Sequence, residues 1–435
     1  MATSFAKQCN EDFGGLKVTV EVHQKSSSVL SQDEILKALV KFCKSHAFSP
    51  SFTQAIREDI HLSKHIENIT LWDASENIMS SNTNTICQGE NMSFHAFRLH
   101  TAQHEDEMLD AENNDLPAAS HWLLPSEAFH GVWESLVYDT DIKENLLSYA
   151  STSLLFADKG VDQNIIAWNR VVLLHGPPGT GKTSLCHALA QKLAIRLSHH
   201  FSYASLLEVN SHSLFSKWFS ESGKLVMKMF KKVEELVEDE NHLIFLLIDE
   251  VESLTAARSA VQSGTEPSDA IRVVNALLTQ IDRLKRHKNV FILATSNVTG
   301  KIDLAFIDRA DIKFFVGFPS AAAIYSIFRS CIEELSRVKI IQPKGLLLQN
   351  ASLASNPDLP VDKMHAFGDC EHSLNLFKIS KASEGLSGRT LRKLPFLAHA
   401  RFVRKVGSVT LGEFLEVLSQ IVEMQFKERN ELHDT

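Results

Sequence analysis

Long apolar runs and paired cysteines are both missing from this chain. Its longest strongly apolar segments have only the length of a β-strand, and the first residues, MATSFAKQCNEDFGG, lack the apolar core of a signal peptide. The six cysteines include no CxxC pair, which argues against a zinc ribbon and against a disulfide framework. We therefore expect a protein of the cytosol or nucleus, with reduced thiols and no membrane partner.

Excess positive charge and metal-binding spacings are also lacking. The formal net charge of -9 argues against a surface built to hold nucleic acid, although it leaves a local basic channel open. The 20 histidines form no HExxH or other metal spacing, so we interpret them as ordinary surface or core residues. The 435 residues, 44% hydrophobic and 22% charged, are typical of a soluble globular protein with two or three domains.

The first hundred residues predict a small α+β domain. KVTVEVH, residues 17–23, alternates like a half-buried strand. SQDEILKALVKFCKSH begins with Ser31 and Glu34 in capping-box spacing, ahead of an apolar period of three and four, and predicts a helix. HEDEMLDAENND, residues 104–115, is acidic and poor in β-branched residues, which is typical of a solvated linker. We expect an N-terminal domain at 1–100 and an acidic linker at 101–124.

After the linker, short apolar runs alternate with amphipathic helical segments. This pattern predicts an α/β fold, in which helices cover both sides of a parallel sheet. The runs are VVLLHG (171–176), SLLEVN (205–210), LIFLLIDE (243–250), NVFILATSN (289–297) and IKFFVGFP (312–319). Beyond Pro319 the chain is mainly helical to Asn430, with a long loop expected at 342–370. We expect a large domain at 125–318 and a small helical domain at 319–435.

A glycine-rich segment, GPPGTGKTS, follows the first of these strands directly. It satisfies GxxxxGK[ST] between a strand and a helix, the context in which backbone N–H groups and a helix N-terminus hold phosphates. Lys182 would bridge the β- and γ-phosphates of ATP, and the Thr183 hydroxyl would bind Mg²⁺. The simpler alternative is a Gly-Pro turn before a helix. The nine expected ATP-binding residues are Gly176, Pro177, Pro178, Gly179, Thr180, Gly181, Lys182, Thr183 and Ser184.

Two carboxylates follow the apolar strand LIFLLIDE. At the carboxyl end of this strand, Asp249 can hold Mg²⁺ through water, and Glu250 can polarise the attacking water. A nucleotide kinase usually lacks the second acid, so hydrolysis is favoured. Asn297 ends the next strand and would lie beside the γ-phosphate, unless it caps a turn. Arg309 could stabilise the charge that develops during transfer, or it could be a solvated surface arginine.

Two large aromatics interrupt the polar segment LFSKWFSESGK. Trp218 and Phe219, with Lys217 beside them, fit a substrate grip on a loop facing a channel, because aromatic rings contact many kinds of side chain. The alternative is the apolar face of a helix edge, and Phe219 is the residue of the two that fits a buried position better.

The order of these motifs resembles the AAA+ ATPases over residues 125–418. Three longer segments are similar to the pachytene checkpoint protein 2 family, also called the thyroid receptor-interacting protein family. They are HWLLPSEAFHGVWESLVYD, SKWFSESGKLV and GLSGRTLRKLPFLAHA.

The resemblance implies a hexameric ring with ATP sites between subunits, where Arg309 acts in trans as an arginine finger. Many AAA ATPases carry a second arginine three residues later, but this chain has Ile312 there. Arg389 resembles a sensor-2 arginine, residues 217–219 resemble the pore loop, and residues 252–268 fit a second channel loop. The family opens closed HORMA-domain proteins of the spindle checkpoint and of meiotic chromosome axes, often with an adaptor that the N-terminal domain recognises. Nucleus, cytoplasm and meiotic chromosomes are the implied locations.

Two other classes of ATP-binding protein fit this sequence less well. A nucleic-acid ATPase, such as a clamp-loader or helicase subunit, would need a basic stripe, and none is visible in the sequence. A scaffold that binds ATP without turnover would have no need of Glu250.

Overall fold

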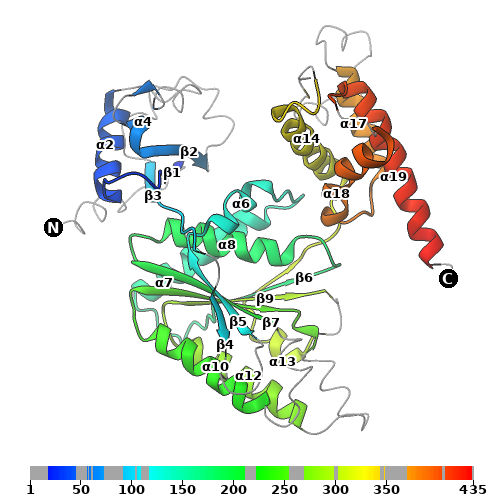
Figure 1. The fold of residues 1–435 in the computed structure, drawn as a ribbon. Helices are drawn as coiled ribbons and strands as arrows, with labels where there is room; N and C mark the ends of the chain where they lie inside the picture. Colours follow the sequence, from blue (N-terminus) through cyan, green and yellow to red (C-terminus); the bar gives the residue numbers. More distant parts are fainter. Residues whose placement is uncertain are drawn as a thin grey trace.

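Three bodies follow one another in this computed structural model: an N-terminal α+β body, a central sheet between helices, and a C-terminal group of helices (Figure 1). No helix in the described part of the chain is long and apolar enough to cross a membrane. The structure describes residues 18–45, 56, 58–59, 62–72, 92–102, 105–108, 117–210, 222–253, 269–297, 302–342, 347, 370–403 and 407–433.

The described part of the N-terminal body consists of a three-stranded sheet packed against helices. Its strands are β1 (Val18–Gln24), β2 (Ile66–Trp72) and β3 (Met92–Phe97), in the order β2-β1-β3. β1 pairs antiparallel with β2 and parallel with β3. Helices α2 (Gln32–Ser45) and α4 (Leu62–His65) share one apolar core with these strands.

The predicted capping box at the start of α2 is present. The Ser31 backbone N–H donates to Glu34 at 2.8 Å, and the Glu34 N–H donates back to the Ser31 hydroxyl. The alternation of β1 predicts a strand with one exposed face, but Thr19 and Glu21 on its polar face are also buried. A partner that lies far away in the sequence covers this face.

The expected acidic linker at 101–124 is wrong at residues 105–108 and 117–124. Glu105–Met108 forms β4 and Pro117–Leu124 forms β5, and both belong to the central sheet. β5 pairs antiparallel with β7 (Tyr203–Asn210), and β4 pairs antiparallel with β5 at the edge. Charged residues are common in edge strands, because one side of the strand meets no neighbour. Acidity therefore did not distinguish an edge strand from a linker.

The central sheet has seven strands in the order β10-β6-β9-β8-β7-β5-β4. The five strands from β10 to β7 are parallel, β5 runs the other way, and the edge strand β4 runs in their direction again. All five predicted apolar runs form these parallel strands, which confirms the α/β prediction. Besides β7, the parallel strands are β6 (Val171–His175), β8 (His242–Asp249), β9 (Val290–Ser296) and β10 (Ile312–Phe315).

Helices cover both faces of this sheet (Figure 1). One apolar core joins it to α6 (Val132–Ser135), α7 (Ile142–Asp158) and α8 (Lys182–Arg196), with the short helix η2 (Glu127–Phe129). A second core joins the other face to α10 (Ser222–Val237), α12 (Asp269–Leu284) and α13 (Leu304–Ile307). Burial on both faces explains why the strands are continuously apolar rather than alternating.

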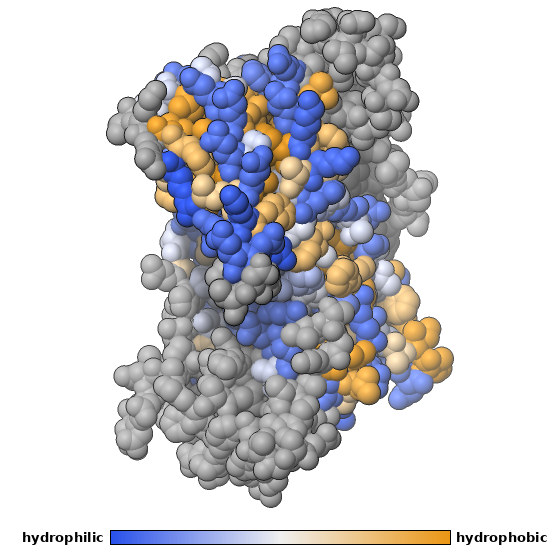
Figure 2. Space-filling model, turned by 90° about the vertical axis from the view of Figure 1, so that its right-hand side faces the viewer, coloured by the Kyte–Doolittle hydropathy of each residue, from blue (hydrophilic) through white to orange (hydrophobic). Residues whose placement is uncertain are grey.

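The C-terminal body, called the lid below, is helical and has a core of its own. Figure 2 faces the lid side of the molecule and shows rows of hydrophilic residues with apolar residues between them. The lid elements are α14 (Ala321–Arg337), α17 (Cys370–Ala382), α18 (Gly388–Ala398), η3 (His399–Val403) and α19 (Leu411–His433). Most of the loop expected at 342–370 lies outside the described residues.

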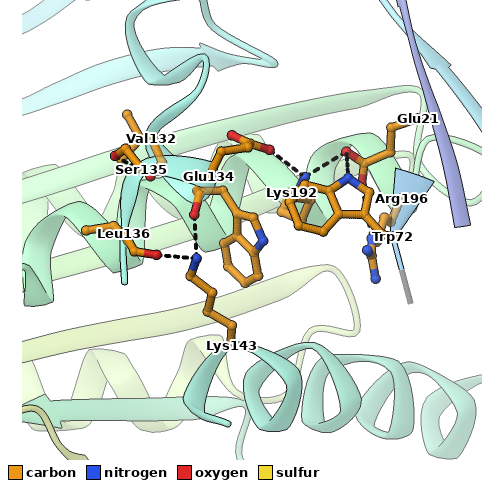
Figure 3. A network of polar contacts seen from close by, with 10 residues as sticks. Glu21, Trp72, Val132, Glu134, Ser135, Leu136, Lys143, Lys192 and Arg196 are labelled. Atoms are coloured by element: carbon orange, nitrogen blue, oxygen red, sulfur yellow. Dashed lines mark hydrogen bonds and ion pairs between the residues drawn. The ribbon is translucent and has the colours of Figure 1, made fainter. Parts of the chain in front are cut away.

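A buried ion pair attaches the N-terminal body to helix α8 (Figure 3). Lys192 on α8 lies 2.7 Å from Glu21 of β1, and both side chains are only 4% exposed. Arg196 and the Trp72 indole N–H also bind the Glu21 carboxylate, at 3.2 and 3.0 Å. The Lys192 ammonium lies 4.0 Å from the centre of the Trp72 ring and 3.2 Å from Glu134. This group of five residues covers the polar face of β1.

Candidate active site

The glycine-rich loop between β6 and α8 requires its glycines. Gly176, Gly179 and Gly181 have φ angles of 142°, 76° and 94°, a region that side chains with a Cβ rarely adopt. A Cβ at Gly176 would lie 2.3 Å from the Val316 carbonyl oxygen, and one at Gly179 would lie 2.8 Å from the Ser387 hydroxyl. The loop therefore packs closely against the strand that leads to the lid and against the lid itself.

Gly176→Ala is expected to weaken nucleotide binding and to lower the free energy of unfolding by about 1–3 kcal/mol, because the strained backbone and the close Val316 oxygen force the loop to move. Gly160→Ala is the matched control, since Gly160 also has a positive φ of 65° but a Cβ there meets nothing within 4 Å. Equilibrium binding of a fluorescent ATP analogue and urea unfolding measure the two effects. Normal binding by Gly176→Ala would contradict this account of the loop.

Lys182 begins helix α8 and turns its ammonium back onto the loop. It is 4% exposed, and its Nζ donates to the carbonyls of Gly176 and Pro177 at 2.9 and 2.7 Å. Burial lowers the pKa of this ammonium, while the carboxylates of Glu252 and Asp249 oppose the shift. The two carbonyls are the partners that phosphate oxygens would replace.

Asp249, at the end of β8, faces the start of α8. The Thr183 hydroxyl donates to its Oδ1 at 3.1 Å, and the Thr295 hydroxyl of β9 donates to the same oxygen. The parallel pairing of β8 with β9 and the loop after β6 bring these three side chains to one edge of the sheet. Both residues predicted to bind the metal therefore lie in direct contact.

Glu250 and Asn297 also meet at this edge. The Asn297 side-chain amide donates to Glu250 Oε1 at 3.2 Å, and the Asn297 backbone N–H donates to Glu252 at 3.1 Å. Glu250 is exposed and has a φ of 57°, an uncommon left-handed conformation for a residue that is not glycine. The Glu252 carboxylate thus fixes the backbone of Asn297, and the side chain of Asn297 fixes the Glu250 carboxylate.

The lid closes over the loop and encloses a cavity of about 400 Å³. The Arg389 backbone N–H donates to the Gly179 carbonyl at 3.0 Å, and the Tyr138 hydroxyl donates to the Gly181 carbonyl at 3.3 Å. The lining includes Arg389 and Arg392 of the lid, Gly179–Gly181 and Ser184 of the loop and helix, residues 136–140, and residues 315–319. Loop and lid together form the walls of one binding site.

The residues that line this cavity do not include Lys182, Thr183, Asp249, Glu250 or Asn297, and they do not include Arg309. Arg309 follows α13 and binds Asp282 of α12, with nitrogen–oxygen distances of 2.9 and 2.7 Å. Lys217, Trp218 and Phe219 of the expected pore loop lie outside the described residues, as does most of the expected second channel loop.

Four residues of the site were missed in the sequence. Thr295 lies two positions before Asn297, so the two-residue period of a strand places both on one face. Glu252 lies two positions after Glu250, but a third acid near two others carries little signal. Tyr138 and Ser387 reach the loop from elements that no local pattern connects with it.

Comparison with known proteins identifies the family. The Pachytene checkpoint protein 2 homolog of Gallus gallus is 51% identical over 425 residues, which cover 96% of this chain and 95% of the relative. This chain belongs to the pachytene checkpoint protein 2 family. The homolog of Xenopus tropicalis is 53% identical over 420 residues, which cover 96% of this chain and 95% of the homolog.

Family models and solved structures agree with the pachytene checkpoint protein 2 assignment. Residues 172–318 match the model for the ATPase family associated with various cellular activities (AAA), and residues 320–426 match the TRIP13-like AAA+ ATPase lid C-terminal domain. The structure of C. elegans PCH-2 is 34% identical, covers 94% of this chain and 99% of its own, and superposes with a TM-score of 0.72. A chain of the E. coli MS115-1 HORMA:CdnC:Trip13 complex shares the fold, with 17% identity and a TM-score of 0.51, over 69% of this chain and 94% of its own.

The resemblance drawn from the sequence is therefore confirmed. As a pachytene checkpoint protein 2 relative with a matching AAA domain, the chain is an AAA+ ATPase that binds ATP.

Proposed function

We propose that this chain forms a six-subunit ring that uses ATP to convert HORMA-domain proteins from a closed to an open conformer. In this proposal it inactivates the spindle checkpoint and controls meiotic recombination and synapsis, in the nucleus, in the cytoplasm and on meiotic chromosomes. Its membership of the pachytene checkpoint protein 2 family supports the meiotic role. The HORMA protein named with the E. coli relative supports the choice of client.

The contact between Glu250 and Asn297, beside the phosphate loop, carries the hydrolytic part of the proposal. Glu250 is exposed at the sheet edge, so it can accept a proton from water that attacks the γ-phosphate. Asn297, 3.2 Å away, orients this carboxylate. Lys182 and the N–H groups of residues 176–184 hold the phosphates, and the buried Lys182 has only the two loop carbonyls to release.

The residues around Thr183 fit Mg²⁺. Its hydroxyl and the Asp249 carboxylate are oxygen donors 3.1 Å apart, and Mg²⁺ takes one or two protein oxygens together with phosphates and water. No cluster of three or more His, Cys, Asp or Glu side chains able to hold a metal occurs among the described residues, which fits a metal that arrives with the nucleotide. When bound, Mg²⁺ neutralises charge on the phosphate oxygens.

The two arginines act from different sides in the proposed ring. Arg389 lines the cavity in its own subunit, where it senses the nucleotide. Arg309 binds Asp282 of α12 and, in this proposal, serves the ATP site of the next subunit as an arginine finger.

We further propose that residues 1–100 recognise substrate and adaptor. Residues 319–435 serve as the helical lid, and the ATPase domain ends at residue 318. Because β4 and β5 belong to the central sheet, we begin the ATPase domain at residue 105 rather than 125.

Trp218→Ala tests whether the expected pore loop grips the substrate protein. The variant is expected to hydrolyse ATP at the normal rate but to open a purified HORMA-domain protein at least about tenfold more slowly, because an aromatic contact supplies part of the grip on the substrate. Client conversion is followed by ion-exchange separation of the closed and open conformers while phosphate release is measured in parallel.

Tyr203→Ala is the matched control, because Tyr203 is 66% exposed at the amino end of β7, the end opposite the phosphate loop. It is expected to keep both activities. If Trp218→Ala also kept both, the grip would be misassigned, and if it failed to fold, Trp218 would be a core residue. If wild-type protein left every HORMA-domain protein closed, the proposed client would be wrong.

A further inference from the structure

Arg309 is held by its own subunit through all three nitrogens of its guanidinium. Asp282 receives two parallel hydrogen bonds, from Nε at 2.9 Å and from Nη2 at 2.7 Å, and the Ala305 carbonyl receives one from Nη1 at 2.6 Å. Such a two-pronged contact fixes the plane of the group as well as its position. Three of the five N–H donors are therefore used within the subunit.

The remaining two donors lie on Nη1 and Nη2, which form the outer edge of the guanidinium. Neither has a partner among the residues that the structure describes, and the side chain is 26% exposed. An outer edge with two N–H groups matches two oxygens of a phosphate. The Arg309 side chain is thus hydrogen-bonded within its own subunit and still has two N–H groups for a further acceptor.

The backbone beside Arg309 is also fixed. Phe306 is fully buried in the core with α12, and Ala310 is 5% exposed. Asp311 accepts hydrogen bonds from the Tyr149 hydroxyl at 2.6 Å and from the Asn169 backbone N–H at 2.7 Å. With the main chain fixed on both sides, the direction of the Arg309 side chain depends on Asp282.

Asp282 itself is charged and anchored. It lies in the last turn of α12, and the Lys285 ammonium lies 2.8 Å from Oδ1, the oxygen that also accepts from Arg309 Nε. Partial burial raises the pKa of Asp282, but the hydrogen bonds from Arg309 and Lys285 lower it more, so that it lies below its usual value. The carboxylate is therefore ionised at neutral pH.

We propose that Asp282 is a positioning residue for catalysis, which holds Arg309 with its outer edge facing the nucleotide of the neighbouring subunit. The proposal rests on the role of Arg309 given above. It assigns to α12 a second task besides covering the sheet, because this helix then sets the orientation of a group that acts on another subunit's ATP.

Asp282→Ala is expected to lower kcat for ATP roughly ten- to a hundredfold and to leave KM little changed, since the misplaced group acts mainly in the transition state. Asp282→Glu can re-form the two-pronged contact and is expected to recover much of the loss. Glu334→Ala is the matched control: Glu334 binds Arg337 with the same geometry, at 2.7 and 2.7 Å, on the exposed side of α14. It is expected to keep normal kcat.

Mixed rings separate positioning from folding. Asp282→Ala subunits keep an intact ATP site, and Lys182→Ala subunits keep an intact Arg309, so their mixture is expected to regain turnover that neither variant has alone. Normal kcat for Asp282→Ala, or no recovery on mixing when Arg309→Ala mixtures do recover, would overturn the assignment of Asp282 alone. Full turnover by Arg309→Ala would overturn both the finger and its positioning. The assay contains no HORMA-domain protein, so it is independent of the proposed client.

Discussion

Glu250→Gln is expected to bind ATP normally and to hydrolyse it at least about 100-fold more slowly, because general base catalysis contributes roughly 10²–10⁴-fold and an amide cannot take the proton. The substitution keeps the size of the side chain and the oxygen that accepts the Asn297 amide at 3.2 Å. Binding and turnover should therefore separate. Single-turnover phosphate release and equilibrium nucleotide binding measure the two quantities.

The same variant should retain its client. If ATP cannot be hydrolysed, the protein stays in its ATP-bound form, and a pull-down in ATP should recover the folded proteins on which it acts. Glu238→Gln is the control, since Glu238 is exposed just after α10 and away from the site. Undiminished hydrolysis by Glu250→Gln would remove Glu250 from the mechanism, whatever the pull-down recovered.

Lys192→Met is expected to lower the free energy of unfolding by about 3–5 kcal/mol, because it leaves the Glu21 carboxylate buried without its main counter-ion. Both side chains are 4% exposed, so water cannot compensate. The loss should be concentrated where the N-terminal body meets α8. Hydrogen exchange should become faster in peptides that cover β1 and should stay slow in β8 and β9.

A double replacement distinguishes the ion pair from simple loss of packing. Glu21→Gln combined with Lys192→Met removes both charges and is expected to be more stable than Lys192→Met alone. Arg401→Met is the control, because Arg401 and Glu428 form a pair 45% and 44% exposed, which should contribute less than about 1 kcal/mol. A similarly small effect of Lys192→Met would mean that the N-terminal body is attached mainly by other contacts.

Those other contacts include pairs of histidine rings that are tilted against each other. His23 of β1 lies 5.0 Å from His130, and His95 of β3 lies 5.9 Å from His199, measured between ring centres. Burial, with His199 and Arg196 nearby, lowers the pKa of His95 to about 3, so this ring is neutral at physiological pH. The boundary between the two bodies therefore includes both the buried Lys192–Glu21 ion pair and the neutral ring of His95.

The parts of the fold that depend on local chemistry could be predicted from the sequence. The phosphate loop needs glycines, a lysine and a hydroxyl residue in consecutive positions, so residues 176–184 identify it without knowledge of the rest. Continuous apolar strands likewise show that both faces of the sheet are covered. Asp249, Glu250 and Asn297 could be grouped because parallel strands end at the same edge.

The parts that depend on distant partners could not be predicted. Glu21 looks like the exposed face of a strand, and only Lys192, 171 residues later, makes its burial possible. The segment 105–124 looks like a linker because the strand that it joins, β7, begins at residue 203. Asp282 and Arg309 are separated by 27 residues, and no pattern of spacing connects them. In each case the fold supplies a partner that lies far away in the sequence.

At Glu250, the left-handed backbone conformation lowers the folding stability of the protein, while the side chain is the one proposed to support ATP turnover. Holding a residue with a Cβ at a φ of 57° costs about 1–2 kcal/mol, which glycine would not incur. Selection for heat resistance alone would therefore favour glycine at residue 250 and yield a firmer but inactive protein. The chain keeps glutamate there, so part of its folding free energy is given up to aim one carboxylate.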